Sequence, residues 1–128
     1  MKESDALMCS FLLRADEFYV LTRFSYQAFL QRMIFRMSHH ALEYYIKAGL
    51  SQYLTEKRIK KLGHNVDSLW KEYETHVFIP GIDTRIISHI NQFEKMRYPG
   101  ESKCIGTLLG PPRIDGIFLV PHPFECEH

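Results

Sequence analysis

Two adjacent histidines, a glutamate and a lysine interrupt an apolar run in the segment MSHHALEYYIKAGLSQYL, residues 37–54. Histidine exchanges a proton near neutral pH more readily than other side chains, and a neighbouring carboxylate can orient its ring. Five polar residues are separated by four, four, three and four positions, which places them in a stripe along one side of a helix. They are Arg32, Arg36, His40, Glu43 and Lys47. The stripe predicts either a solvated helix face with a Glu43–Lys47 ion pair or a polar cleft that could do chemistry.

The same segment offers ligands for a metal ion. His39 and Glu43 are spaced i,i+4, and His40 and Glu43 are spaced i,i+3, so either histidine can share a helix face with the carboxylate. A stable zinc site needs about three or four ligands, and each of these pairs supplies two. We therefore expect no metal and no cofactor here, and we expect His40, Glu43 and Lys47 to line a cleft.

A basic stretch follows in TEKRIKKLGHNVDSLW, residues 55–70. Four cations lie just before His64, namely Lys57, Arg58, Lys60 and Lys61. Such a cluster can contact phosphate groups, but a solubilising loop has the same composition. Both interpretations stay open from the sequence alone.

Length and composition indicate one folding unit. The chain has 128 residues, 45% of them hydrophobic, and a net charge of +1, which excludes a general attraction to nucleic acid by overall charge. Its three cysteines form no CxxC motif and no signal-like segment opens the chain, so we expect a reducing cytoplasm. No apolar run approaches the roughly 18 residues that a membrane span needs, so we expect no membrane segment.

The positions that must hold these side chains have helical periodicity. Apolar spacing and breakers predict four helical segments before residue 100. They are residues 5–24, residues 25–54, a short helix after Asn65 that carries Val66, Leu69 and Trp70, and residues 83–99. Ser25, Asn65 and Asp83 are the expected N-caps, and Gly63 is expected to end the basic segment. We predict an all-α protein, an up-and-down helical bundle of four to five helices.

The last part of the chain has a different composition. Residues 101–128 are rich in glycine and proline and show no helical stripe, so we predict an irregular tail after a bundle formed by residues 1–100. In this tail GIFLV could form a strand and GPPRIDG a turn, which leaves a small hairpin and an extended arm as alternatives.

Three stretches in order, HALEYYIKA, GHNVDSL and MRYPG, resemble the HEPN domain family of small helical proteins. The resemblance covers roughly residues 10–100. The positions that match the family pattern are Glu43, Lys47, His64, Arg97, Tyr98 and Pro99. The chain departs from the family after MRYPG, where the family continues into a long final helix and this sequence enters its tail.

The resemblance implies a helical bundle that pairs through its helices as a homodimer, with a cleft between protomers. It also implies a nucleotide or RNA as ligand, and a minimal nucleotidyltransferase as a further partner. The ligand-binding candidates are then His40, Glu43, Lys47, His64, Arg97 and Tyr98. A non-catalytic module that binds a nucleotide or RNA phosphate is the favoured function.

Ribonuclease members of the family carry an arginine, four to six residues and then a histidine, and they cleave RNA without a metal. The spacing occurs twice here, in Arg32 with His39 and in Arg58 with His64. Neither pair lies where the family carries its nuclease motif. An RNA-cleaving toxin that uses such a pair across a dimer is therefore the alternative, and a helical interaction protein without a ligand is the third possibility.

Overall fold

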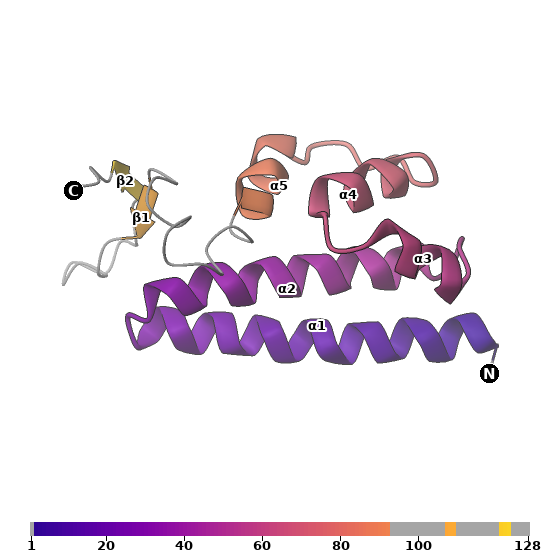
Figure 1. The fold of residues 1–128 in the computed structure, drawn as a ribbon, viewed down its shortest axis with the longest axis horizontal. Coiled ribbons are helices and arrows are strands. Elements are labelled where there is room, and N and C mark those ends of the chain that lie inside the picture. The colour runs from indigo at the N-terminus through magenta and orange to yellow at the C-terminus, as the bar shows by residue number, and fades with distance from the viewer. Residues whose placement is uncertain (1, 93–106, 110–120, 124–128) are drawn as a thin grey trace.

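The structure is a computed structural model that describes residues 2–92, 107–109 and 121–123 (Figure 1). In chain order its elements are α1 Glu3–Gln27, α2 Gln31–Leu50, α3 Glu56–Leu62, α4 Val66–Glu74, α5 Thr84–Asn91, β1 Thr107–Leu109 and β2 Pro121–Pro123. The predicted all-α class is confirmed. The strands β1 and β2 pair antiparallel, whereas the expected strand GIFLV and turn GPPRIDG lie outside the described residues.

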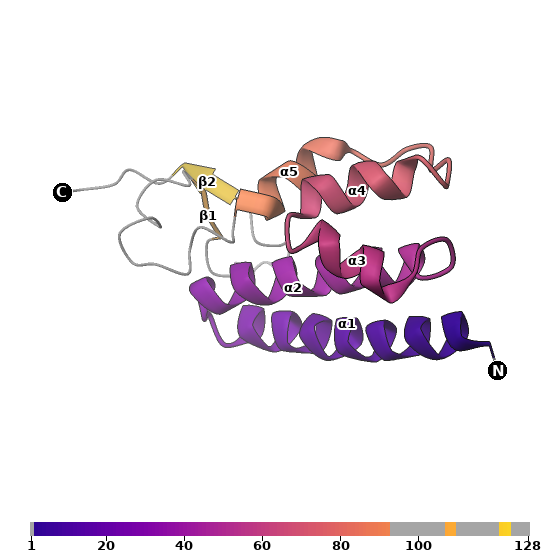
Figure 2. The ribbon, with the colours of Figure 1, turned by 45° about the vertical axis from the view of Figure 1, so that its right-hand side comes forward.

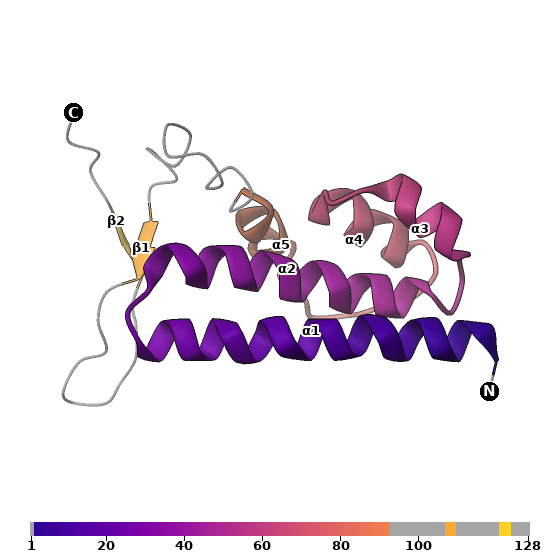
Figure 3. The ribbon, with the colours of Figure 1, turned by 60° about the horizontal axis from the view of Figure 1, so that its bottom comes forward.

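The turn between the first two helices lies later than the sequence indicated. Ser25 was expected to cap the second helix, but it belongs to α1 and is buried. The chain reverses at Phe29, whose φ is 58°, and the N–H of Leu30 donates to the carbonyl of Ser25 at 2.9 Å. Helix α1 is therefore longer than the predicted first helix, and α2 is shorter than the helix predicted over residues 25–54; the two lie antiparallel (Figures 1 and 3).

The three short helices begin and end at residues suited to those positions. Asn65 and Asp83 accept hydrogen bonds from backbone N–H groups in the first turns of α4 and α5, so both predicted N-caps are confirmed. Gly63 ends α3 with a φ of 71°, a backbone conformation that favours glycine. The basic segment itself is the helix α3, capped by Thr55, and is not a loop.

Helix α2 is the middle layer of the molecule. Helix α1 runs along one side of it, and α3, α4 and α5 lie on the other side (Figures 1 and 2). The core on that second side is formed by Ile46, Leu50, Ile59, Val66, Leu69, Trp70 and Ile87. Toward α1, Tyr44 stacks on Phe18 with ring centroids 5.6 Å apart and also contacts Phe11. Helix α2 is thus covered on two sides, which decides how its polar residues are buried.

Helix α1 carries apolar residues on its outward side as well. Four of them define what we call the outer face of α1: Leu13, Val20, Leu21 and Phe24, each 46–65% exposed. When a helix carries apolar residues on every side, each side is normally packed against another protein element. In the described part of the chain, no helix combines the length and apolar character that a membrane crossing requires.

Candidate functional site around Glu43

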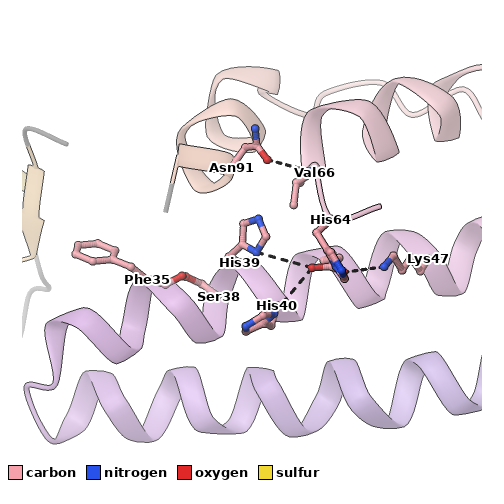
Figure 4. Close-up of polar contacts among 9 residues, drawn as sticks. Phe35, Ser38, His39, His40, Lys47, His64, Val66 and Asn91 are labelled. Atoms are coloured by element: carbon pink, nitrogen blue, oxygen red, sulfur yellow. Dashed lines mark hydrogen bonds and ion pairs between the residues drawn. The ribbon is translucent and has the colours of Figure 1, made fainter. Parts of the chain in front are cut away.

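Glu43 occupies the middle of α2 and its side chain is only 1% exposed. One of its oxygens, Oε1, receives two close partners. The ammonium of Lys47, one helical turn later, lies 2.7 Å away, and Nδ1 of His64, from the turn between α3 and α4, also lies 2.7 Å away. Two stretches that are 21 residues apart in the sequence therefore meet at one carboxylate oxygen (Figure 4).

The second oxygen, Oε2, faces the two adjacent histidines. Nδ1 of His39 and Nδ1 of His40 each lie 3.9 Å from it. Oε2 is buried, and it accepts no hydrogen bond from the residues that the structure describes. His39 is buried, whereas His40 is half-buried and packs against the Phe18 ring at 4.9 Å. We call Glu43, Lys47, His64, His39 and His40 the Glu43 cluster.

The electrostatics of the cluster fix the protonation of Glu43. Burial raises the pKa of its carboxyl, but contacts with His40, Lys47 and His64 outweigh that effect and lower the pKa from 4.5 to about 2. Glu43 is therefore ionised at neutral pH and can only accept hydrogen bonds. It follows that Nδ1 of His64 carries a proton and donates a hydrogen bond to Oε1, which leaves Nε2 with a lone pair whenever the ring is neutral.

His64 is the member of the cluster most open to solvent, with a side chain 62% exposed. Its position is set by the residues around it, because Gly63 adopts a positive φ before it and the Asn65 side chain caps α4 after it. The next residue, Val66, is fully buried, and its N–H donates to the Asn91 side chain at 2.9 Å (Figure 4). The turn therefore presents an exposed imidazole on a firmly anchored backbone.

A second tie joins α4 to α5 close to this turn. The Asp67 carboxylate accepts hydrogen bonds from Ser88 at 3.0 Å and from Asn91 at 3.1 Å. Nothing in the sequence marks these three residues as a set. Asp67 lies more than twenty positions before Ser88 and Asn91 in the chain, and no periodic pattern links it to them. Only the fold reveals that the three residues hold the turn that carries His64.

The polar stripe predicted on the second helix divides into two parts. Arg32 and Arg36 are exposed, as a solvated face requires. Glu43 and Lys47 are buried, so the solvated-face interpretation is wrong for them, although their ion pair is confirmed at 2.7 Å. The physical reason is that α2 is the middle layer, with α1 on one side and the α3–α4 turn on the other.

The two Arg-His pairs with nuclease spacing meet different environments. Arg58 lies 3.9 Å from Glu72 of α4, and its nearest ionic contact is that carboxylate. His39 is buried beside Glu43, whereas Arg32 is exposed near the start of α2. Of the four catalytic candidates, His64 alone combines an exposed ring with a buried orienting carboxylate.

The remaining candidates concern the basic helix and the MRYPG stretch. Lys57, Arg58, Lys60 and Lys61 are all exposed on or beside α3, and Lys60 pairs with Glu56 at 2.9 Å. Arg97 and Tyr98 lie outside the described residues. The cluster that the structure describes is therefore built from α2 and the α3–α4 turn.

Comparison with known proteins returned no match of any kind: no family model fits the chain, and no curated protein and no solved structure is similar to it. Function must therefore be inferred from the Glu43 cluster, the basic helix and the sequence stretches themselves.

Proposed function

We propose that this chain is a HEPN-like helical module that binds the phosphate of a nucleotide or RNA, with His64 as the central contact. The observation that supports the proposal is the convergence at Glu43. Glu43, Lys47 and His64 come from two separate stretches that resemble the family, and they share one buried carboxylate oxygen. If the matching residues had no shared role, the fold would have no reason to bring them together at one oxygen.

The three side chains have different roles in this proposal. Lys47 is 9% exposed and bound to Glu43, so it neutralises the buried carboxylate and does not contact the ligand. Glu43 orients His64 by accepting a hydrogen bond from its Nδ1–H, and Nε2 of the ring is directed to the ligand. A protonated imidazole donates a charge-assisted hydrogen bond to a phosphate oxygen. Lys57 and Lys61, exposed on the neighbouring α3, add positive charge.

Arg97 and Tyr98 complete the proposed ligand contacts on the basis of the resemblance. Their stretch MRYPG follows α5, and α5 is tied to the α3–α4 turn through Asn91. A guanidinium can bind a phosphate with two parallel hydrogen bonds, which an ammonium cannot do. His40, the other ligand-binding candidate, is half-buried beside Oε2 and acts in this proposal by supporting Glu43.

We also propose that two copies of the chain pair through the outer face of α1. Leu13, Val20 and Phe24 on this face are each more than 60% exposed. Water disfavours such surface by about 25 cal/mol per Å², so covering it with a second α1 stabilises a dimer. The alternative occupant of this face is a nucleotidyltransferase partner. In that case the chain is a monomer when it is purified alone.

A second candidate function is metal-independent cleavage of RNA, and one observation favours it. A buried, ionised carboxylate that holds the Nδ1 proton of an exposed histidine is the arrangement that prepares a histidine for acid–base catalysis. Nε2 of His64 would accept the proton of a ribose 2′-hydroxyl. The 2′-oxygen would then bond to phosphorus as the bond from phosphorus to the 5′-oxygen breaks; the 5′-oxygen takes a proton from water, leaving a 2′,3′-cyclic phosphate and a 5′-hydroxyl.

The test measures binding of a fluorescently labelled single-stranded RNA by anisotropy over a series of salt concentrations. The proposal predicts binding that weakens as salt rises, and a loss of about tenfold in His64→Ala, as expected for one hydrogen bond to a charged group. His76→Ala is the matched control, because His76 also lies beside a glutamate, Glu72, at 3.6 Å but outside the cluster. It should bind like the parent protein.

The same samples separate the candidate functions. Cutting of the RNA in the presence of a chelator, abolished in His64→Ala, would replace the binding module by the nuclease. If neither binding nor cutting occurs at low salt, both proposals fail and a helical interaction protein without a ligand remains. If His76→Ala weakens binding as much as His64→Ala, the contact does not involve the Glu43 cluster.

A further inference from the structure

We propose that His39, His40 and Glu43 form a three-ligand site for a divalent transition metal of the zinc class. The site uses Nδ1 of each imidazole and Oε2 of the carboxylate, and it is independent of phosphate binding at His64. Two features of the Glu43 cluster lead to it: the spacing of these three atoms and the unsatisfied state of Oε2.

The spacing is close to what a metal requires. Each imidazole Nδ1 lies 3.9 Å from Oε2, and all three donor atoms lie within 4.8 Å of one another. With metal–ligand bonds of about 2.1 Å, tetrahedral donors are about 3.4 Å apart, so each imidazole must approach the carboxylate by about 0.5 Å, and two donors at the 4.8 Å limit must approach each other by about 1.4 Å. The His40 side chain is 23% exposed, so its ring is not enclosed on every side as the buried His39 ring is.

The second feature is the unequal use of the two carboxylate oxygens. Lys47 and His64 both bind Oε1, whereas Oε2 is buried without a hydrogen-bond donor among residues 2–92. A buried carboxylate oxygen without a donor carries a desolvation cost that a ligand would relieve. The hydrogen bonds to Oε1 also hold the carboxylate plane in place, which is the role that partners of metal ligands usually have.

The ligand count changes when the fold is known. From the sequence each histidine was paired separately with Glu43, which gave two ligands and led us to expect no metal. In the structure both histidines lie equally far from the same oxygen, which gives three. Three protein ligands with an open fourth position, filled by water, are a known arrangement for zinc. The positive charge of Lys47 opposes a cation, so we expect a micromolar rather than a tighter site.

The test uses the full-length, tag-free protein freed of metal with a chelator and then dialysed. Titration with Zn²⁺ in a calorimeter and with Co²⁺ by visible absorption should each show an equivalent of metal bound at this site. The informative variant is His40→Phe, because a phenyl ring keeps the packing against Phe18 and removes the ligand. It should bind one equivalent fewer than the parent protein, while its circular dichroism stays the same.

Counting the lost equivalent distinguishes this site from any other, including one made by the histidines and cysteines of residues 101–128. His76→Ala is the control, since His76 and Glu72 form an i,i+4 pair like His39 and Glu43 but have no second imidazole beside them. It should bind as many equivalents as the parent. The proposal is overturned if His40→Phe binds as many equivalents as the parent, or if the parent binds no metal at micromolar concentration.

Discussion

Replacement of Glu43 by glutamine removes the charge at the centre of the cluster and keeps the shape of the side chain. The buried ammonium of Lys47 then loses its counter-charge, and His64 loses a charged acceptor. Removing one partner of a buried ion pair typically costs 3–5 kcal/mol, because the other charge stays buried without compensation. The lowered pKa gives a similar figure: a shift from 4.5 to about 2, at about 1.4 kcal/mol per unit, amounts to about 3–4 kcal/mol.

We therefore expect Glu43→Gln to lower the free energy of unfolding by about 3–4 kcal/mol, measured by urea denaturation followed by circular dichroism. Glu56→Gln is a matched control, since Glu56 and Lys60 form the same i,i+4 pair at 2.9 Å on the exposed surface of α3. It should cost at most about 0.5 kcal/mol. Adding Lys47→Met to Glu43→Gln should recover part of the loss, because the uncompensated charge is gone.

The reasoning is refuted if Glu43→Gln costs no more than Glu56→Gln, since burial would then have no energetic effect on the pair. It is also refuted if the double variant is less stable than Glu43→Gln alone, since Lys47 would then stabilise the fold without its partner.

Two further predictions concern pH and assembly. The pKa of Glu43 is lower in the folded protein than its ordinary value of 4.5. The stability that ionised Glu43 contributes is therefore complete above pH 4.5 and is lost as the pH falls toward about 2. Acid denaturation curves should show this loss in the parent protein and a smaller loss in Glu43→Gln. Sedimentation at low micromolar concentration should show a dimer that Val20→Glu disrupts and that Phe78→Glu, at an exposed apolar residue outside α1, does not disrupt; a parent protein that sediments only as a monomer would contradict the proposed pairing.

The parts of the fold that depend on local chemistry were predictable from the sequence. Asn65, Asp83 and Gly63 each act at a helix end through their own side chain or backbone freedom, and all three do so in the structure. Ser25 shows the limit of such signals, because a serine inside a helix looks like a cap when the chain reverses a few residues later. The reversal takes place at Phe29, a bulky residue with positive φ that no local rule favours.

The candidate site was predictable in its members but not in its environment. Glu43, Lys47 and His64 were identified by spacing and resemblance, yet their burial depends on α2 being the middle layer, which is a tertiary property. The common approach of His39 and His40 to one oxygen was not predictable either, because adjacent residues on a helix normally point about 100° apart. The side chains of Asp67 and Asn91, which anchor the turn, gave no signal at all.

The central claim is that a buried, ionised Glu43 accepts a hydrogen bond from Nδ1–H of His64, so that Nε2 of the protonated ring donates to a phosphate ligand. Nitrogen-15 NMR of the histidine rings tests it most directly, because the two ring nitrogens give distinct shifts for each tautomer. In neutral solution the neutral form of His64 should carry its proton on Nδ1, lose this preference in Glu43→Gln, and shift at Nε2 when a mononucleotide is added. A neutral His64 protonated on Nε2, or a ring that does not respond to the nucleotide, would contradict the account.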